Sequence, residues 1–314
     1  MPRLLPALAA ASFALVATPL ASQNADNPFR LVGTGEEFAK LQDAVNAVGD
    51  GEDVIEIAPG TWRDCAVQTA GTITYKAAEP GTAIIDRRTC EGKAALVLRG
   101  REAVVEGLIF QNMFVPDRNG SGIRLEKGNL VVRNSIFRES EQGILTGDDP
   151  ASSILVERST FSRLGRCDGG VGCAHSLYIG DYGSFTVRNS RFEKGSGGHY
   201  VKSRAARIEV TDSSFDDVQG KTTNYMIDLP NGAKGLIARN MFVQGKDKEN
   251  YSAFITVAPE GRQRDSSGLL ITENDAKIAP GIDRSTTFVA NWTGDAIQVT
   301  KNKLGAGLKV SDER

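Results

Sequence analysis

A repeated pattern runs through most of this chain and constrains its fold more than any other feature. An apolar residue is followed by polar residues, often an Arg-Asn pair, and five positions later by an aromatic or aliphatic residue. Successive first members are separated by 27, 24, 31, 23, 27, 34 and 28 residues. Such a period is typical of a solenoid, in which each turn buries its apolar side chains against the next turn. The eight pairs are Val105/Phe110, Val132/Phe137, Val156/Phe161, Val187/Phe192, Val210/Phe215, Ile237/Phe242, Ile271/Ala276 and Val299/Leu304.

The segments inside each repeat are short, rich in β-branched residues and separated by Gly, Asn and Asp, with no helical period between them. Two or three strands fit into each repeat, whereas a propeller needs about four strands per blade. We therefore predict an all-β fold, a right-handed parallel β-helix of roughly ten coils. Recurrent asparagines suit a tight left-handed corner and can hydrogen-bond along the stack. They are Asn134, Asn189, Asn240, Asn274 and Asn302.

The segment before the repeats is expected to close one end of the solenoid. Phe38, Leu41 and Val45 are among the apolar residues at helical spacing, which predicts a short amphipathic helix over residues 36–48. Alternation then predicts a strand over 54–57, and further strands over 72–76, 82–86 and 95–98. A capping helix protects the otherwise open strand edge at the end of a solenoid.

Residues 1–22 have the features of a signal peptide. Arg3 provides the positive charge, residues 4–16 form a short apolar run, and small residues near Ala21 offer a cleavage site. We expect an exported protein, periplasmic or secreted, from a bacterium of Gram-negative type. Residues 23–314 are expected to form a single β-helix domain with no membrane span, because no later apolar run is long enough.

Four cysteines agree with export to an oxidising compartment. Of the three possible connectivities, the simplest joins Cys65 to Cys90 and Cys167 to Cys173. A zinc site is the alternative, but the sequence contains no CxxC pair. The 37 basic and 39 acidic side chains nearly balance, which does not favour nucleic acid as a partner. We expect a monomer.

The only two histidines, His175 and His199, lie 24 residues apart, close to one repeat. Counting back from the apolar anchors places them in one column with Tyr225, at 12, 11 and 12 residues before Val187, Val210 and Ile237. Stacked strands are about 4.8 Å apart, so these side chains are expected to gather on one face. The neighbouring column contains Tyr178, Lys202 and Asp228, and the same count extends the two columns to Glu260 and Arg262.

These residue types suit an acidic sugar polymer cleaved by β-elimination. Lys202, Arg204 and Arg262 can neutralise a uronate carboxylate, which makes the neighbouring proton easier to remove. Either histidine can take that proton, because imidazole titrates near neutral pH. Tyr178 or Tyr200 can protonate the leaving oxygen. The predicted catalytic residues are His175, Tyr178, His199, Lys202 and Arg204, and the predicted substrate-binding residues are Tyr200, Tyr225, Asp228, Asn231, Glu260 and Arg262.

Several alternatives remain open at the level of sequence. The histidines can be surface residues of a non-catalytic polysaccharide-binding or envelope-associated solenoid. A glycoside hydrolase would use Asp228 or Glu260 with Asp181, and an epimerase is a further possibility on such a scaffold. No cofactor is required, although the same three carboxylates are compatible with Ca²⁺. Asp148 and Asp149 precede Pro150, which favours a turn.

The N-terminal pattern LQDAVNAVGDGEDVIEIAPGTW and the repeats resemble the pectin-lyase-like superfamily of right-handed β-helices. The segments GHYVKSRA, YMIDLPNG and PEG resemble a group of bacterial exported β-helix proteins. The resemblance implies a carbohydrate cleft along one face; families on this scaffold include pectate, alginate and chondroitin-type lyases, polygalacturonases and mannuronan epimerases. The calcium-binding aspartates of pectate lyases and the carboxylate set of polygalacturonases are not recognisable as motifs, so the fold is better defined than the reaction.

Overall fold

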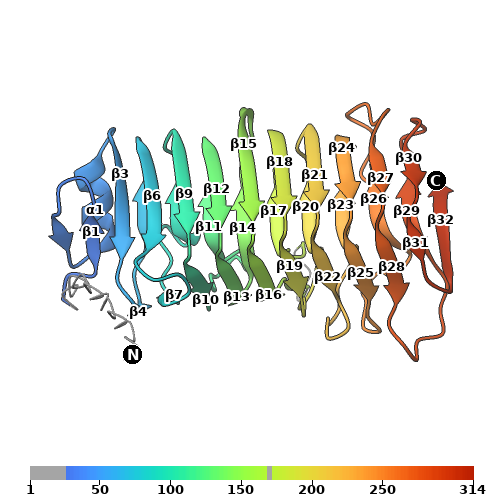
Figure 1. Cartoon of the computed structure of the whole chain (residues 1–314), viewed down its shortest axis with the longest axis horizontal. Coiled ribbons are helices and arrows are strands. Elements are labelled where there is room, and N and C mark those ends of the chain that lie inside the picture. Colours follow the sequence, from blue (N-terminus) through green and yellow to red (C-terminus); the bar gives the residue numbers. More distant parts are fainter. Residues whose placement is uncertain (1–25, 168–171) are drawn as a thin grey trace, which may run out of the picture.

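The computed structural model, described here for residues 26–167 and 172–314, is a parallel β-helix (Figure 1). Each coil contributes one strand to each of three sheets, and sheets 2 and 3 contain ten strands each. The predicted all-β solenoid of roughly ten coils is confirmed. The predicted signal peptide lies outside the described residues.

Sheet 1 has twelve strands, of which β1 and β2 pair antiparallel at the N-terminal end. Its strands are β2 (Glu37–Phe38), β1 (Phe29–Leu31), β3 (Glu52–Ile57), β6 (Thr72–Ala77), β9 (Glu102–Glu106), β12 (Asn129–Arg133), β15 (Asp149–Glu157), β18 (Tyr182–Arg188), β21 (Arg207–Thr211), β24 (Lys234–Ala238), β27 (Leu270–Thr272) and β30 (Gln298–Thr300).

Sheet 2 consists of β4 (Gly60–Trp62), β7 (Ala83–Asp86), β10 (Ile109–Gln111), β13 (Ile136–Ser140), β16 (Thr160–Leu164), β19 (Arg191–Glu193), β22 (Ser214–Asp216), β25 (Met241–Gln244), β28 (Asp275–Ile278) and β31 (Lys303–Leu304). Sheet 3 consists of β5 (Ala66–Gln68), β8 (Ala94–Leu98), β11 (Ser121–Leu125), β14 (Gln142–Thr146), β17 (Leu177–Ile179), β20 (Val201–Ser203), β23 (Ile227–Leu229), β26 (Ala253–Val257), β29 (Thr286–Asn291) and β32 (Leu308–Glu313).

The repeat seen in the sequence forms the core. All eight first members align across sheet 1, and their partners five residues later align across sheet 2. Six of these partners are phenylalanines that stack with ring centroids 4.8–5.0 Å apart. Small residues on sheet 3 make room for the stack: a Cβ at Gly143 would lie 2.8 Å from the Phe161 ring. The stacked rings are Phe110, Phe137, Phe161, Phe192, Phe215 and Phe242.

The corner between sheets 1 and 2 is held by a polar ladder. Asn134 and Asn189 have the expected left-handed backbone, with φ of 50° and 49°. The prediction is wrong for Asn240, Asn274 and Asn302, which lie one position later in their repeats. Instead, the Asn240 backbone N–H donates to Asn274 Oδ1 and that of Asn274 to Asn302 Oδ1, each at 3.0 Å. Serines fill this position in the preceding coils: Ser135, Ser159, Ser190 and Ser213.

The N-terminal end is closed by α1 (Leu41–Val48), which buries Leu41, Ala44 and Val45 (Figure 1). The helix is shorter than the predicted 36–48, because residues 37–38 pair with β1 as a strand. No helix in the described part of the chain has both the length and the apolar character to span a membrane.

Candidate functional site

The outward face of sheet 3 carries the predicted column of functional side chains. In the strand register, Tyr178 on β17 aligns with Lys202 on β20, and Lys202 aligns with Asp228 on β23. The column continues to Thr256 on β26. This pairing confirms the predicted register of Tyr178, Lys202 and Asp228. Side chains alternate along each strand, so these three point away from the apolar interior.

The second predicted column is also present. The His175 and His199 rings stack with centroids 4.9 Å apart, and His199 stacks on Tyr225 at 5.5 Å. Both histidines line a cavity of about 280 Å³ together with Tyr178 and Lys202. The rings therefore lie outside the aliphatic core, although little of either ring reaches solvent.

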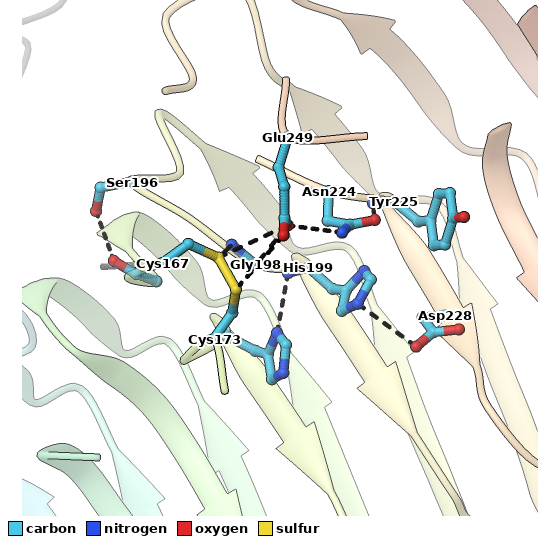
Figure 2. The surroundings of a disulfide bond; sticks show 11 residues. Cys167, Cys173, Ser196, Gly198, His199, Asn224, Tyr225, Asp228 and Glu249 are labelled. Carbon is cyan, nitrogen blue, oxygen red and sulfur yellow. Dashed lines mark hydrogen bonds and ion pairs between the residues drawn. A yellow bond between two sulfur atoms is a disulfide. The ribbon is translucent and has the colours of Figure 1, made fainter. Parts of the chain in front are cut away.

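Hydrogen bonds fix how the histidines present their nitrogen atoms. The His199 backbone N–H donates to His175 Nδ1 at 3.0 Å, so a neutral His175 carries its proton on Nε2. His199 Nε2 lies 3.5 Å from Asp228 Oδ2 (Figure 2). An ionised Asp228 favours the proton on that nitrogen, which leaves His199 Nδ1 as the unprotonated atom. Within the described residues, His199 Nδ1 makes no hydrogen bond of normal geometry, although the Tyr225 backbone is near enough to act on the pKa of His199 in the upward direction.

Burial keeps both histidines neutral. It lowers the pKa of His199 from 6.5 to about 3, with a further contribution from the positive charge of Lys202. Burial also lowers the pKa of His175 well below its ordinary value, assisted by His199 and Lys202. The pKa of Asp228 is raised, because burial outweighs the effect of Lys202 and of the hydrogen bond from Thr256.

These shifts predict that acid destabilises the fold. The unfolded chain takes up protons on the histidines below pH 6.5 while the folded protein does not, so stability is complete above that pH and falls as the pH is lowered. As the pH falls from 6.5 to 5, each histidine that stays neutral in the folded protein lowers the free energy of unfolding by about 2 kcal/mol. Urea unfolding at pH 7 and 5 should show a smaller loss in a His175→Gln/His199→Gln double variant than in the wild type.

The comparison between the two proteins is needed because Asp228 acts in the opposite direction: lowering the pH relieves its unfavourable buried charge. The neighbouring charged groups Lys202, Glu260 and Lys248 also contribute to the field on the histidines. An equal loss of stability in wild type and double variant would contradict the assignment of two buried neutral histidines.

Two cations lie at the centre of the site and share one carboxylate. Glu260 accepts hydrogen bonds from Lys202 Nζ and, at 2.7 Å, from Arg204. Burial alone would raise the pKa of Glu260, but these two hydrogen bonds lower it to about 2. Arg204 also donates to Asn231 Oδ1 at 2.6 Å and to the Tyr178 hydroxyl at 3.3 Å. Hydrogen bonds thus connect five of the predicted site residues in one network: Tyr178, Lys202, Arg204, Asn231 and Glu260.

Two residues of the predicted site lie elsewhere. Tyr200 is 1% exposed, and its hydroxyl donates to Asp217 Oδ1 at 2.7 Å, so the prediction that it binds substrate or donates a proton is wrong. It directly follows His199, and the alternation of the chain turns it inward. Arg262 pairs with Asp295 at 2.8 Å and does not join the columns.

The predicted extension of the columns to Glu260 and Arg262 is wrong for a simple reason. Counting back from Ile271 assumes that the extra residues of this coil precede the sheet 3 strand. They follow β26 instead, and Thr256 occupies the column position. Glu260 reaches the site from the loop rather than from the strand register.

The three carboxylates considered for Ca²⁺ are not brought together. Asp181 pairs with Arg264, Asp228 accepts from Thr256, and Glu260 pairs with Lys202 and Arg204. The contribution of Arg264 was not foreseen in the sequence. Asp148 and Asp149 accept backbone hydrogen bonds from Asp181 and Gly128, which gives them structural partners. The predicted turn is wrong, because β15 begins at Asp149 and includes Pro150.

Both predicted disulfides are confirmed, Cys65–Cys90 and Cys167–Cys173. The second lies beside the histidines (Figure 2). The Gly198 N–H donates to Cys167 Sγ at 3.2 Å, and Glu249, a residue not singled out from the sequence, lies 3.7 Å from the same sulfur. Glu249 also accepts from Asn224 at 2.7 Å, which connects the disulfide to the coil that carries Tyr225.

Comparison with known proteins agrees with this architecture. A family model described as "Right handed beta helix region" matches residues 81–242, more than half of the chain. The chain therefore belongs to the right-handed β-helix family, and the predicted handedness is confirmed. No curated protein matches its sequence.

Two solved structures are similar to the chain in fold. One is the PL6 family alginate lyase AlyGC, with a TM-score of 0.57 and 16% identity over 84% of this chain and 38% of the lyase. The other is ORF18 of Geobacillus virus E2, with a TM-score of 0.55 and 12% identity over 87% of this chain and 57% of the viral chain. The chain spans well under two thirds of either structure.

Proposed function

We propose that this protein cleaves an acidic polysaccharide by β-elimination in the groove on sheet 3. The observation that carries the proposal is the convergence of Lys202, Arg204, Tyr178 and the His175–His199 pair on two successive coils. Such a set provides the three elements that elimination needs: charge neutralisation, a base and an acid. The similarity in fold to an alginate lyase is compatible with this reaction but does not define it.

The first element is recognition of a uronate carboxylate by Lys202 and Arg204. Both side chains line cavities of the groove, and both are bound to the Glu260 carboxylate in the free protein. A substrate carboxylate is chemically equivalent to that partner. Its binding spreads negative charge toward the two cations and so lowers the energy of the carbanion that forms when the adjacent proton leaves.

The second element is a base, which we assign to His199; its unprotonated Nδ1 is shielded from solvent in the free protein and has to become exposed when substrate binds. His175 carries its ring proton on Nε2 and so acts as a hydrogen-bond donor. Asp228 orients His199 from the opposite side. Burial, with a contribution from Lys202, lowers the pKa of His199, so this ring is unprotonated and able to accept a proton.

The third element is an acid. The Tyr178 hydroxyl accepts a hydrogen bond from Arg204 and keeps its own proton for donation. In the reaction the C5–H and C4–O bonds break and a C4=C5 double bond forms. The proton from C5 goes to His199, and the leaving oxygen takes the proton of Tyr178.

A glycoside hydrolase is less well supported by the electrostatics of the groove. Its general acid is a carboxyl group with a raised pKa. Asp228 has a raised pKa, but this carboxyl is 2% exposed and is hydrogen-bonded by Thr256. Glu260 has the opposite property, with a pKa of about 2, and Asp181 is paired with Arg264. The two disulfides support our further proposal that the protein works outside the cytoplasm.

A panel of acidic polysaccharides tests the proposed reaction. We expect at least one of alginate, polygalacturonate, polyglucuronate, hyaluronan or chondroitin sulfate to yield an unsaturated product that absorbs in the ultraviolet. New reducing ends without this absorbance would indicate hydrolysis instead. Binding to a polymer without either signal would identify a non-catalytic carbohydrate-binding protein. A Lys202→Met variant is the control, because it should lose the product signal while keeping its circular dichroism spectrum.

A further inference from the structure

The groove continues beyond the proposed catalytic residues toward the N-terminal end of the solenoid. A second cavity of about 490 Å³ lies over β11, β14 and β17. It shares Tyr178 and Cys173 with the histidine cavity, so the two cavities adjoin along sheet 3. The second cavity is also lined by Arg124 and Arg204.

Arg124 belongs to the same outward column as the catalytic residues. It aligns with Leu145 on β14, which aligns with Tyr178 on β17 and then with Lys202 on β20. Three coil steps separate Arg124 from Lys202, roughly 14 Å at the spacing of stacked strands. A single sugar residue cannot reach both cations, whereas a short oligosaccharide that follows the solenoid axis can.

Arg124 also differs from Arg204 in its partners. Arg204 is neutralised by Glu260, but Arg124 forms no ion pair or side-chain hydrogen bond within residues 26–167 and 172–314. Its Nε atom is shielded from solvent and unpartnered. A partly buried guanidinium without a counter-ion binds carboxylates well, because its planar N–H groups match both oxygens and no existing pair has to be broken.

Two carboxylates line the same cavity and limit where an anion can bind. Asp117 Oδ1 accepts the backbone N–H of Asn119, and Asp148 Oδ1 accepts that of Asp181. Neither forms an ion pair with Arg124. Because these two carboxylates repel an anion, an incoming substrate carboxylate is expected to bind only next to the Arg124 guanidinium.

We propose that Arg124 forms a second anion-binding subsite, which takes the carboxylate of a sugar residue about three positions along the chain from the one held by Lys202 and Arg204. This inference rests on the proposed function and defines its substrate more closely. The ligand is a polymer with repeated carboxylates, and recognition by both subsites requires at least about four sugar residues at one residue per coil.

The test compares ligand lengths in the Arg124→Gln variant. Binding is measured by calorimetry with uronate disaccharides and pentasaccharides from the polymer that the wild type cleaves, in a Tyr178→Phe background that slows turnover. Loss of a charged hydrogen-bonding pair should raise the Kd of the pentasaccharide about tenfold or more. The Kd of the disaccharide should change much less, because a disaccharide cannot reach from Arg124 to Lys202. Arg124→Lys, which keeps the charge, should retain part of the affinity.

Arg207→Gln is the matched control, since Arg207 is an exposed arginine on β21 of sheet 1. It should bind both ligands like the parent protein. Equal pentasaccharide affinity with and without the Arg124→Gln change would overturn the second subsite alone. If no polymer is cleaved, pentasaccharides of mannuronate, galacturonate and glucuronate are used. Failure of all three to bind would overturn both the subsite and the proposed function.

Discussion

Replacing Tyr178 with phenylalanine should lower kcat on the cleaved polymer by about 100-fold or more, with the fold unchanged. The change removes one oxygen atom, and with it the proposed proton donor to the leaving oxygen; general acid catalysis of this kind contributes about 10²–10⁴-fold. The ring remains, so its edge contact with His175 and the cation–π contact with Lys202 are retained. Substrate binding should therefore suffer much less than turnover.

Initial rates of product formation at saturating polymer measure this effect. Tyr251→Phe offers the same chemical change at a residue that is 50% exposed and lies outside the groove cavities, and it should leave kcat unaltered. A Tyr178→Phe protein that turns over at more than half the wild-type rate would show that another group protonates the leaving oxygen. A rise in KM at constant kcat would assign Tyr178 to binding alone.

Replacing Phe161 with alanine should lower the free energy of unfolding by about 3–5 kcal/mol. The side chain is fully buried and stacks on Phe137 at 5.0 Å and on Phe192 at 4.9 Å. Its removal leaves a cavity that the chain cannot easily fill, because both neighbouring rings belong to strands fixed by pairing on either side.

Urea unfolding followed by circular dichroism measures the loss. Phe161→Leu should cost clearly less, because it keeps most of the apolar volume but loses the ring stacking. Phe114→Ala serves as a surface control: this ring is 57% exposed, and its removal should change stability by less than about 0.5 kcal/mol. A Phe161→Ala protein as stable as the surface control would mean that the stack contributes little to the fold.

The periodic part of the fold was predictable because burial repeats with the coil. Val105 and Phe110, and the seven pairs after them, lie in the core strands that their spacing indicated. The start of α1 was not predictable in the same way. Glu37 and Phe38 fit a helical pattern locally, but pairing with Arg30 and Phe29 makes them a strand. Such contacts between distant segments leave no local signal.

The candidate site was predictable only where the strand register carries it. Tyr178, Lys202 and Asp228 align because each lies eight or nine residues before a buried anchor. Glu260 approaches from a loop, and no residue count gives the path of a loop. Tyr200 was assigned to the site because it follows His199, whose column position was correct. Neighbouring residues point to opposite sides, so Tyr200 lies in the interior instead.

The position of the site along the solenoid determines which coils can unfold locally without disrupting the site. In a repeat protein each coil is stabilised mainly by its two neighbours, so unfolding spreads from the free ends. β17, β20 and β23 are interior strands of sheet 3, with four strands on the N-terminal side and three on the C-terminal side. Fraying of the outermost coil at either end therefore leaves the residues around Lys202 paired on both sides.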